Sequence, residues 1–194
     1  MNYQPILEND FVRLEPLTIK DVNRLILVAQ EENLIQHSPS IINSKESLSK
    51  YIEKAISDRV NKTSIPFIIY HKGLNSYLGS TRFGLINNYN KVLHIGWTWI
   101  SKSIQGTGIN QQMKFLMLQY AFEVLEFEKV EFKIDERNIR SRKAVEKIGG
   151  TLEGVLRKDT LMKDGFRRST CCYGILKEEW PHIKSSIFKG FEND

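Results

Sequence analysis

Two glycines in a short polar loop carry the most specific chemical signal in this chain. Gly106 and Gly108 follow the stretch from Val92 to Ile100, which has the pattern of a strand, and precede an amphipathic stretch that begins at Asn110. Glycines allow backbone conformations that direct several amide N–H groups toward one point. A helix N-terminus adds unpaired N–H donors and partial positive charge, so this loop is suited to a pyrophosphate.

Glycine loops of this kind also occur in two well-known nucleotide sites and in ordinary chain connections. A Walker A loop is excluded because no Gly-Lys-Ser/Thr sequence follows at the required spacing. A Rossmann dinucleotide site fits poorly, since Gln111 occupies the third glycine position and five residues separate Ile100 from Gly106. The glycines alone would fit a plain strand–turn–helix connection, so the order of the surrounding elements must decide.

Hydrophobic periodicity predicts a single α+β domain. The first strand covers 11–15, and two helices follow it. Thr18 caps the first helix, with Asp21 completing a capping box, and the second helix starts at Ser44. Three strands joined by tight turns come next, in the pattern of an antiparallel meander; they cover 66–70, 77–86 and 92–100.

The second half of the chain alternates helices and strands. The expected elements are a helix at 110–125, a strand at 130–134, a helix at 141–148, a hairpin at 151–176 and a short tail helix at 180–188. The first of these helices presents an apolar stripe of Met113, Leu116, Met117, Tyr120, Ala121 and Val124. The expected fold is a mixed, mostly antiparallel sheet with one central parallel crossover, flanked by helices.

The composition is that of a globular protein. Of 194 residues, 41% are hydrophobic and 26% are charged, and no apolar run approaches the roughly 20 residues needed to cross a bilayer. The N-terminal sequence lacks the basic and apolar regions of a secretory signal. Cys171 and Cys172 are adjacent and therefore poorly placed for a disulfide. A cytoplasmic location without a membrane partner is the simplest expectation.

The net charge of +5 permits an anionic partner. A phosphorylated cofactor and a nucleic acid would both satisfy this condition. The basic residues are dispersed, however, and their densest groups, at 137–143 and 157–158, are interrupted by acidic and apolar residues. A basic nucleic-acid-binding protein is therefore the weaker alternative, because charge alone supports it.

A further motif, Asn138-x-x-Ser141, follows the strand at 130–134. In this order, the loop Gln105-Gly106-Thr107-Gly108, the long helix, the strand and the motif resemble the GNAT superfamily of acyl-CoA N-acyltransferases, and more closely its RimJ/RimL-like branch. The likeness extends over most of the chain, from Phe11-Val12-Arg13-Leu14-Glu15-Pro16-Leu17 to Glu179-Trp180-Pro181. It implies one N-acetyltransferase domain over 1–194, with a core of about 11–177 and a short C-terminal helix at 178–189.

The resemblance implies a site for acetyl-CoA as cosubstrate. The strand that ends at Ile100 and the strand at 130–134 would form a central parallel pair that splays apart. The pantetheine arm would lie between them and pair with the backbone of Trp99, Ile100 and Ser101. The pyrophosphate would bind the amides of the glycine loop, namely Gln105, Gly106, Thr107, Gly108, Ile109 and Asn110.

The opposite wall of this implied site begins at the Asn138-x-x-Ser141 motif. Asn138 would hydrogen-bond the pantetheine arm, and Ser141 would lie near the thioester sulfur. Arg142 or Lys143 would meet the 3′-phosphate, although both would equally suit a solvated helix face.

The implied reaction needs a base for the amine, and His94 is the candidate. Members of this branch often carry a glutamate at the matching strand position, and imidazole can accept a proton near neutral pH. Strand alternation places His94 in phase with Gly96 and Thr98, on the face opposite Ile95, Trp97 and Trp99. A polar strand residue facing solvent is an equal alternative, and a water chain would also serve as the base.

The reaction also needs an acid for the leaving thiolate, and the tyrosine that many family members use is replaced here by Val145. Ser141 is the substitute, either protonating the sulfur or hydrogen-bonding to it. A serine there would also cap the helix at 141–148. Tyr173 on the last strand is a second candidate acid, although strand tyrosines more often pack in a core.

The expected function is direct transfer of an acetyl group to a primary amine, on a protein N-terminus or a small molecule, within a ternary complex. The helix at 18–30 and the segment 31–44 would line the acceptor side and set specificity. No metal is expected, because the four histidines and two cysteines show no ligand spacing. A catalytically inactive CoA-binding module is the alternative suggested by the missing tyrosine. A homodimer is compatible with the resemblance, but the sequence does not decide it.

Overall fold

A single eight-stranded sheet organises the protein, as the computed structural model shows for residues 1–191. The last residues of the expected domain, 192–194, lie outside the described residues. The strands, in chain order, are β1 (Leu7–Glu8), β2 (Val12–Pro16), β3 (Ile65–His71), β4 (Ser76–Asn87), β5 (Val92–Ile100), β6 (Lys129–Asp135), β7 (Thr151–Leu161) and β8 (Arg167–Leu176). Their order across the sheet is β1-β2-β3-β4-β5-β6-β8-β7.

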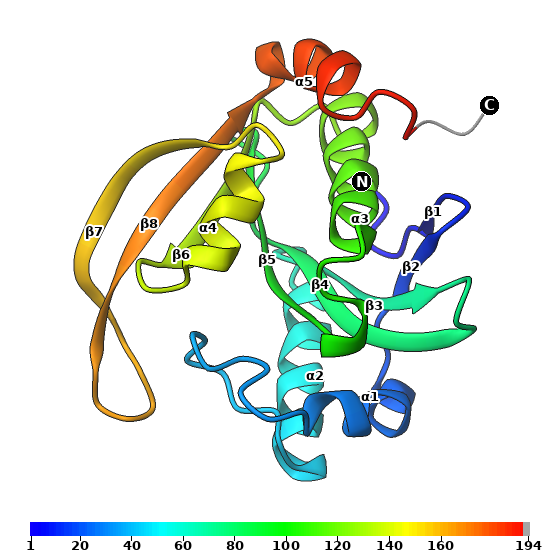
Figure 1. Ribbon diagram of the computed structural model, residues 1–194, viewed down its shortest axis with the longest axis vertical. Coiled ribbons are helices and arrows are strands. Elements are labelled where there is room, and N and C mark those ends of the chain that lie inside the picture. Colours follow the sequence, from blue (N-terminus) through cyan, green and yellow to red (C-terminus); the bar gives the residue numbers. More distant parts are fainter. Residues whose placement is uncertain (192–194) are drawn as a thin grey trace.

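Five α-helices flank the sheet (Figure 1). They are α1 (Val22–Ala29), α2 (Lys45–Val60), α3 (Ile109–Gln119), α4 (Ile139–Glu146) and α5 (Trp180–Ser186). Short 3₁₀ turns occupy Ile19–Asp21, Lys102–Ile104 and Lys177–Glu179, and a π-helical turn, Tyr120–Val124, continues α3.

The only parallel neighbours in the described sheet are β5 and β6. Their pairing ends at His94 and Glu131, although β5 continues to Ile100 and β6 continues to Asp135. The expected mixed sheet with a central splayed parallel pair is therefore confirmed. The sequence did not indicate β1, nor that β8 would lie between β6 and β7.

The sheet separates two hydrophobic cores because alternate strand residues face opposite sides. On one side α3 buries Met113 and Met117 against sheet residues such as Phe67. On the other side α1 and α2 bury Leu25 and Leu48 against the next residue of the same strand, Ile68. Figure 1 shows α1 and α2 together at one end of the molecule, with α3 and α5 at the other.

The predicted capping residues Thr18 and Ser44 lie at the starts of the two N-terminal helical segments. The backbone N–H of Thr18 donates to Asp21 Oδ2 at 2.8 Å, as in a capping box. At α2, Ser44 Oγ accepts the N–H of Ser47 at 3.1 Å. The predicted start of α2 is confirmed, whereas Thr18 precedes a 3₁₀ turn, Ile19–Asp21, and α1 itself begins at Val22.

Two helix predictions need correction. The stripe at 110–125 holds as far as Ala121, but Val124 is 62% exposed, because the π-helical turn rotates the final residues away from the core. The helix expected at 141–148 begins at Ile139, and its cap is Asn138, whose Oδ1 accepts the N–H of Ser141 at 3.1 Å. Ser141 is therefore not the helix cap.

An extra residue interrupts the pairing of β5 with β4. Arg82 pairs with Gly96 and Ser80 with Trp99, so two residues of β5 lie opposite one residue of β4. Trp97 has a φ of 49°, in the left-handed region that is strained for a bulky side chain. This arrangement is a β-bulge, and it bends β5 where its pairing with β6 has just ended.

The bulge also reverses the alternation of side chains along β5. The ring of His94 packs edge-on against the ring of Trp97, at 5.4 Å between centroids. Thr98 instead faces α3, where Lys114 donates to its hydroxyl. The expectation that His94 shares a face with Thr98, opposite Trp97 and Trp99, is therefore wrong, because it assumed an unbroken strand.

The close approach of β4 and β5 beyond the bulge can be tested by a substitution at Gly79 of β4. A Cβ at Gly79 would lie 2.2 Å from the carbonyl oxygen of Trp99 and 3.0 Å from Ile100 Cα. We expect Gly79→Ala to lower the free energy of unfolding by about 1–3 kcal/mol, measured by urea denaturation. Gly154→Ala on β7, where a Cβ would meet nothing within 4 Å, should change it by no more than about 0.5 kcal/mol. Equal losses in the two variants would contradict this account.

Candidate functional site

The glycine loop between β5 and α3 forms an open cradle of backbone amides. Gly106 and Gly108 have φ values of 82° and 90°, which favour glycine, and a Cβ on either would meet nothing within 4 Å. Gly108 is the N-cap of α3 and provides no side-chain cap. The first amides of α3 therefore have no capping side chain, and open space lies at both glycines, as an anion site requires.

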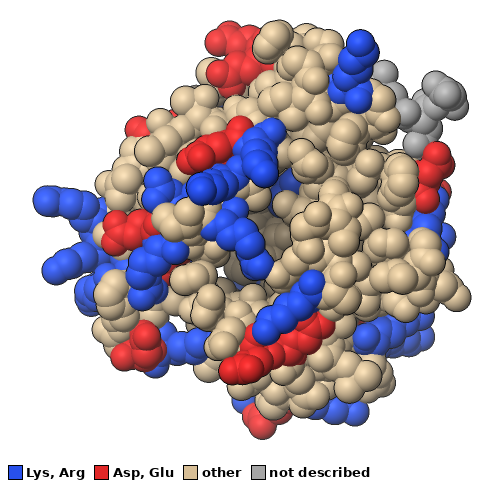
Figure 2. Space-filling view, in the orientation of Figure 1, with Lys and Arg blue, Asp and Glu red and all other residues tan. Residues whose placement is uncertain are grey.

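The charges around this loop suit an anion. The first turn of α3 contains no acidic residue, so nothing there opposes the positive end of the helix dipole. Figure 2 shows a hollow near the middle of this face, with Lys and Arg side chains along much of its border. Acidic side chains are interspersed with them, so the basic side chains do not form a continuous stripe.

The edge of β5 beyond the split provides backbone groups for an extended ligand. The N–H of Ser101 donates to Leu78 O of β4 at 2.8 Å. Backbone groups of successive strand residues point to opposite edges, so Ile100 directs its N–H and C=O away from β4, toward the gap that β6 leaves. Of the expected residues Trp99, Ile100 and Ser101, only Ile100 is thus oriented to pair with a ligand there.

The side chain of Gln105 occupies part of this edge. Gln105 Nε2 donates to Ile100 O at 3.0 Å, and Arg140 Nη1 of α4 donates to Gln105 Oε1. Gln105 therefore bridges β5 to α4 across the gap. A ligand that pairs with the carbonyl of Ile100 would have to displace this amide.

The N-terminus of α4 forms the opposite wall. Asn138 uses Oδ1 to cap the helix, which leaves its amide nitrogen Nδ2 as the donor that can face a ligand. Ser141 lies in the first turn of the same helix and is partly exposed. The structure thus brings Asn138 and Ser141 to one side of the gap and the glycine loop to the other.

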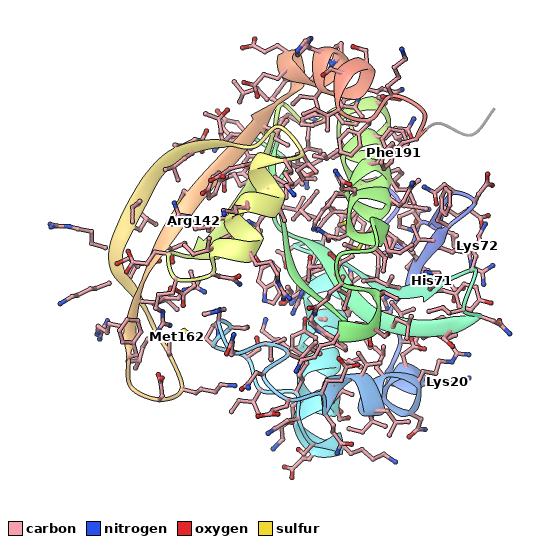
Figure 3. All side chains as sticks on the ribbon, in the orientation of Figure 1. Lys20, His71, Lys72, Arg142, Met162 and Phe191 are labelled. Atoms are coloured by element: carbon pink, nitrogen blue, oxygen red, sulfur yellow. The ribbon has the colours of Figure 1, made fainter. Side chains whose placement is uncertain are left out.

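Two of the remaining candidates are engaged inside the protein. Arg142 Nε donates to the hydroxyl of Tyr173 at 3.1 Å, and that hydroxyl donates to Glu146 Oε1 at 2.8 Å. Figure 3 labels Arg142 on α4. Burial raises the pKa of Tyr173. Arg142 and Tyr173 therefore fix α4 to β8, whereas Lys143 is exposed and Val145 is buried in the core.

On the face of the sheet opposite α3, the bulge places the indole ring of Trp97 at the surface, where it forms a flat platform. The guanidinium of Arg82 lies 4.4 Å from the centroid of the Trp97 ring, and Tyr51 Oη donates to Trp97 O at 3.3 Å. The ring packs over Gly84, where a Cβ would lie 2.3 Å from it. These contacts hold the strained residue in place with 36% of its surface exposed.

His94 lies beneath this platform and is only 6% exposed, so the expectation of a solvent-facing polar residue is wrong. Its Nδ1 has no hydrogen-bond partner within the described chain. Burial lowers the pKa of His94 from 6.5 to about 3, and the positive charges of Lys133, Lys114 and Arg82 act in the same direction. The imidazole is therefore neutral at pH 7 but holds a proton too weakly to make an effective base.

The sequence analysis missed Lys114, the only buried lysine among the described residues. Its Nζ donates to Thr98 Oγ1 at 3.1 Å, and burial lowers its pKa from 10.5 to about 7. A signal was present, because Lys114 precedes Met117 by three residues and Ala121 by seven, which is the spacing of the apolar stripe. A charged residue at such a position is unusual enough to be examined.

The segment between α1 and α2, residues 31–44, approaches the start of β8. Arg168 Nη1 donates to His37 O at 3.0 Å, and Lys163 Nζ donates to Ser40 O at 3.3 Å. Asp135, fully buried at the end of β6, pairs with Arg137 at 2.7 Å. This segment therefore spans from the α1–α2 side of the sheet to the β7–β8 hairpin, over the face that carries Trp97.

The same segment is also fixed to the glycine loop. One carboxylate oxygen of Glu31 accepts the hydroxyl of Ser101 at 2.6 Å, and the other accepts the N–H of Lys102 at 2.7 Å. The loop that follows β5 and the segment that covers the opposite face thus share one carboxylate.

The side chains present do not form a metal centre: within residues 1–191, no three histidine, cysteine, aspartate or glutamate side chains are grouped so that they could hold an ion. None of the helices in that range combines the length and apolar character that crossing a bilayer requires.

Comparison with known proteins assigns this fold and loop to a family. A family model described as "Acetyltransferase (GNAT) domain" matches residues 12–151, well over half of the chain. The chain is 28% identical over 177 residues to the "Putative ribosomal N-acetyltransferase YdaF" of Bacillus subtilis (strain 168), a match that covers 89% of this chain and 94% of that protein.

Solved structures share the fold. A GCN5-related N-acetyltransferase from Brucella melitensis has a TM-score of 0.89 and 24% identity, covering 97% of this chain and 86% of that chain. The Microcin C7 self immunity acetyltransferase MccE, in complex with acetyl-CoA and AMP, has a TM-score of 0.77 and 24% identity, covering 87% and 93% of the two chains.

A split parallel pair beside a glycine loop at a helix N-terminus, in this fold, defines the class of N-acyltransferases. Within that class the chain belongs to the GNAT acetyltransferase family.

The burial of His94 predicts a pH dependence of stability. Because the folded pKa, about 3, lies below the ordinary value of 6.5, the unfolded chain binds a proton between these values that the folded chain does not. Stability from His94 is thus present above pH 6.5 and is lost as the pH falls. Relative to His94→Gln, the natural chain should lose about 2 kcal/mol more between pH 7 and pH 5, measured by urea denaturation. Titration of the His94 imidazole near pH 6.5 in NMR spectra of the folded protein, with its signal assigned by its loss in His94→Gln, would contradict this.

Proposed function

We propose that this enzyme transfers an acetyl group from acetyl-CoA directly to a primary amine, within a ternary complex. One observation carries the proposal: β5 and β6 separate after His94 and Glu131, immediately beside an uncapped helix N-terminus. The gap offers a path for an extended arm, and the helix N-terminus offers a site for its pyrophosphate. The thioester would then lie between the α4 wall and the bulge of β5.

The residues that would hold the donor lie on both walls of the gap. The amides from Gln105 to Asn110 would bind the pyrophosphate, and the backbone of Ile100 would pair with the arm once Gln105 releases it. Asn138 Nδ2 would bind the arm from α4, with Ser141 near the sulfur. Two observations support this assignment. There is open space at Gly106 and Gly108, and the first turn of α3 contains no acidic residue.

The transfer itself needs no covalent intermediate on the enzyme. The lone pair of a neutral amine forms the new C–N bond, the C–S bond breaks, and the electron pair leaves with the sulfur. The amine loses one proton and the thiolate gains one. With the pKa of His94 near 3, water that reaches the acceptor face is a better route than His94 for the proton of the amine.

Acetyl-CoA is supported as the donor by a relative in the fold. MccE, whose crystal structure contains acetyl-CoA, shares this fold with a TM-score of 0.77. For the acceptor, the Bacillus subtilis relative is named a ribosomal N-acetyltransferase, which favours the α-amino group of a cytoplasmic protein over a small amine. The segment 31–44, held against the β7–β8 hairpin, would determine which amine reaches Trp97.

The donor site can be tested by calorimetric titration of acetyl-CoA into the natural chain and Gly108→Asp. The aspartate places negative charge where the pyrophosphate would bind, so we expect micromolar binding to the natural chain and at least about 100-fold weaker binding to the variant. Gly190→Asp is a matched control, because Gly190 also has a positive φ (83°) and open space around it, far from the loop in sequence. Equal affinity of all three proteins, or no binding to the folded natural chain, would reject the proposed donor site.

The roles of Asn138 and Ser141 can be separated by stability and activity. Asn138→Ala removes the cap of α4 and should lower the free energy of unfolding by about 1 kcal/mol. Ser141→Ala should change stability by less than about 0.5 kcal/mol, because the serine is not the cap. If Ser141 contacts the sulfur, kcat should fall about 10-fold or more with an accepted amine, while KM for acetyl-CoA changes little. Full activity of Ser141→Ala would remove this residue from the mechanism.

A further inference from the structure

Lys114 projects from α3 to the place where the parallel pair opens. Its Nζ lies 3.1 Å from Thr98 Oγ1 and 5.9 Å from the centroid of the Phe132 ring. Thr98 belongs to β5 and Phe132 to β6, and both lie beyond His94 and Glu131, where the pairing of the two strands ends. The ammonium group is therefore positioned between the separated strands, on the α3 side of the gap.

The protein compensates only part of the cost of burying this charge. An ammonium group can donate three hydrogen bonds, and Thr98 Oγ1 accepts one of them. Thr98 Oγ1 is itself shared with Thr81 Oγ1 at 2.7 Å. Among the described residues, no carboxylate forms an ion pair with Lys114, and its neighbours along the helix, Met113 and Met117, are fully buried in the core.

An apolar residue would pack at this position at lower cost. Burying an incompletely paired charge costs several kcal/mol, on the order of what a single well-packed core residue contributes. Burial alone accounts for the lowered pKa of Lys114, about 7, so both protonation states are populated at neutral pH. The positive charge of Lys114 also contributes to the lowered pKa of His94, which faces the other side of β5. Lys114 therefore has hydrogen-bond donors available to a ligand in the gap.

Of the candidate acids considered so far, only Ser141 remains near the sulfur, and a serine hydroxyl can hydrogen-bond a thiolate but is a far weaker acid than an ammonium group. Val145 is an apolar core residue, and the hydroxyl of Tyr173 already donates to Glu146. His94 is neutral and lies on the acceptor face. Lys114 is the ionisable donor that the fold places at the gap itself.

We propose that Lys114 is the acid of the reaction: its ammonium group donates a proton to the sulfur of CoA as the C–S bond breaks. The electron pair of that bond leaves with the sulfur, the proton from Lys114 converts the thiolate to a thiol, and Lys114 becomes a neutral amine. The proton lost by the attacking amine restores the ammonium through water, so protons balance over one turnover. This proposal rests on the proposed acetyl-CoA-dependent function.

The thiol of bound CoA provides a test that does not need the acceptor. The full-length chain is saturated with CoA, and thiolate formation is followed by ultraviolet absorbance as the pH is raised, with desulfo-CoA as the blank. A free thiol has a pKa of about 8.5, and a neighbouring ammonium group should lower that of the bound thiol by about 1 unit or more. In Lys114→Met, which fills the same space without charge, the pKa should return to the free value or above it.

Each outcome of this titration has a separate meaning. A lower thiol pKa in the natural chain than in Lys114→Met, at similar CoA affinity, supports the proposal. The same thiol pKa in both proteins overturns the role of Lys114 and leaves the acetyltransferase function intact. Failure of the folded natural chain to bind CoA overturns the proposed function and, with it, the role of Lys114.

Kinetics with any accepted amine give an independent check. Lys114→Met should lower kcat about 100-fold or more, with KM for acetyl-CoA within about 3-fold of the natural value, because the proton is needed only in the transition state. Removing a buried charge should leave stability unchanged or raised, so a folding defect is not expected. Lys147→Met, at an exposed lysine after α4, is the control that should retain full kcat. A rise in KM with unchanged kcat would show that Lys114 only binds the donor.

Discussion

The structure depends on one extra residue in β5. A parallel pair in the centre of a sheet would normally continue its hydrogen bonds along its whole length. Here the bulge at Trp97 bends β5 immediately after its pairing with β6 ends, and backbone groups beyond it face a gap in place of a neighbouring strand. The same bulge moves Trp97 onto the face of the sheet that carries His94, and Thr98 onto the face that α3 covers. One irregularity therefore shapes both the donor side and the acceptor side.

The bulge is costly, and the surrounding residues show how the fold maintains it. Trp97 has a strained backbone, and Arg82, Tyr51 and Gly84 hold its ring and carbonyl in place. Buried ionisable groups lie on both sides of the strand there, with His94 under the indole and Lys114 behind Thr98. Burial disfavours the charged form of both, which keeps basic groups partly neutral in a positively charged protein.

The sequence indicated the fold well because its signals were local. Capping residues such as Ser44 and the glycines of the loop fix helix ends through neighbouring atoms, and the order of elements defined the mixed sheet. The predictions failed where non-local geometry decides: alternation along β5 was assumed to be unbroken, so the face of His94 was wrong. Lys114 was passed over although it has the spacing of the apolar stripe, because that spacing places it on a helix face but does not show which groups across the sheet surround it.

Glu31 gives the structure one more property. Its carboxylate holds Ser101 and Lys102 at the start of the glycine loop, and the segment that it begins reaches the β7–β8 hairpin. This carboxylate is thus a direct link between the segment on one face of the sheet and the glycine loop on the other. Where binding on one face changes affinity at the other, thermodynamic reciprocity requires the change to be equal in both directions.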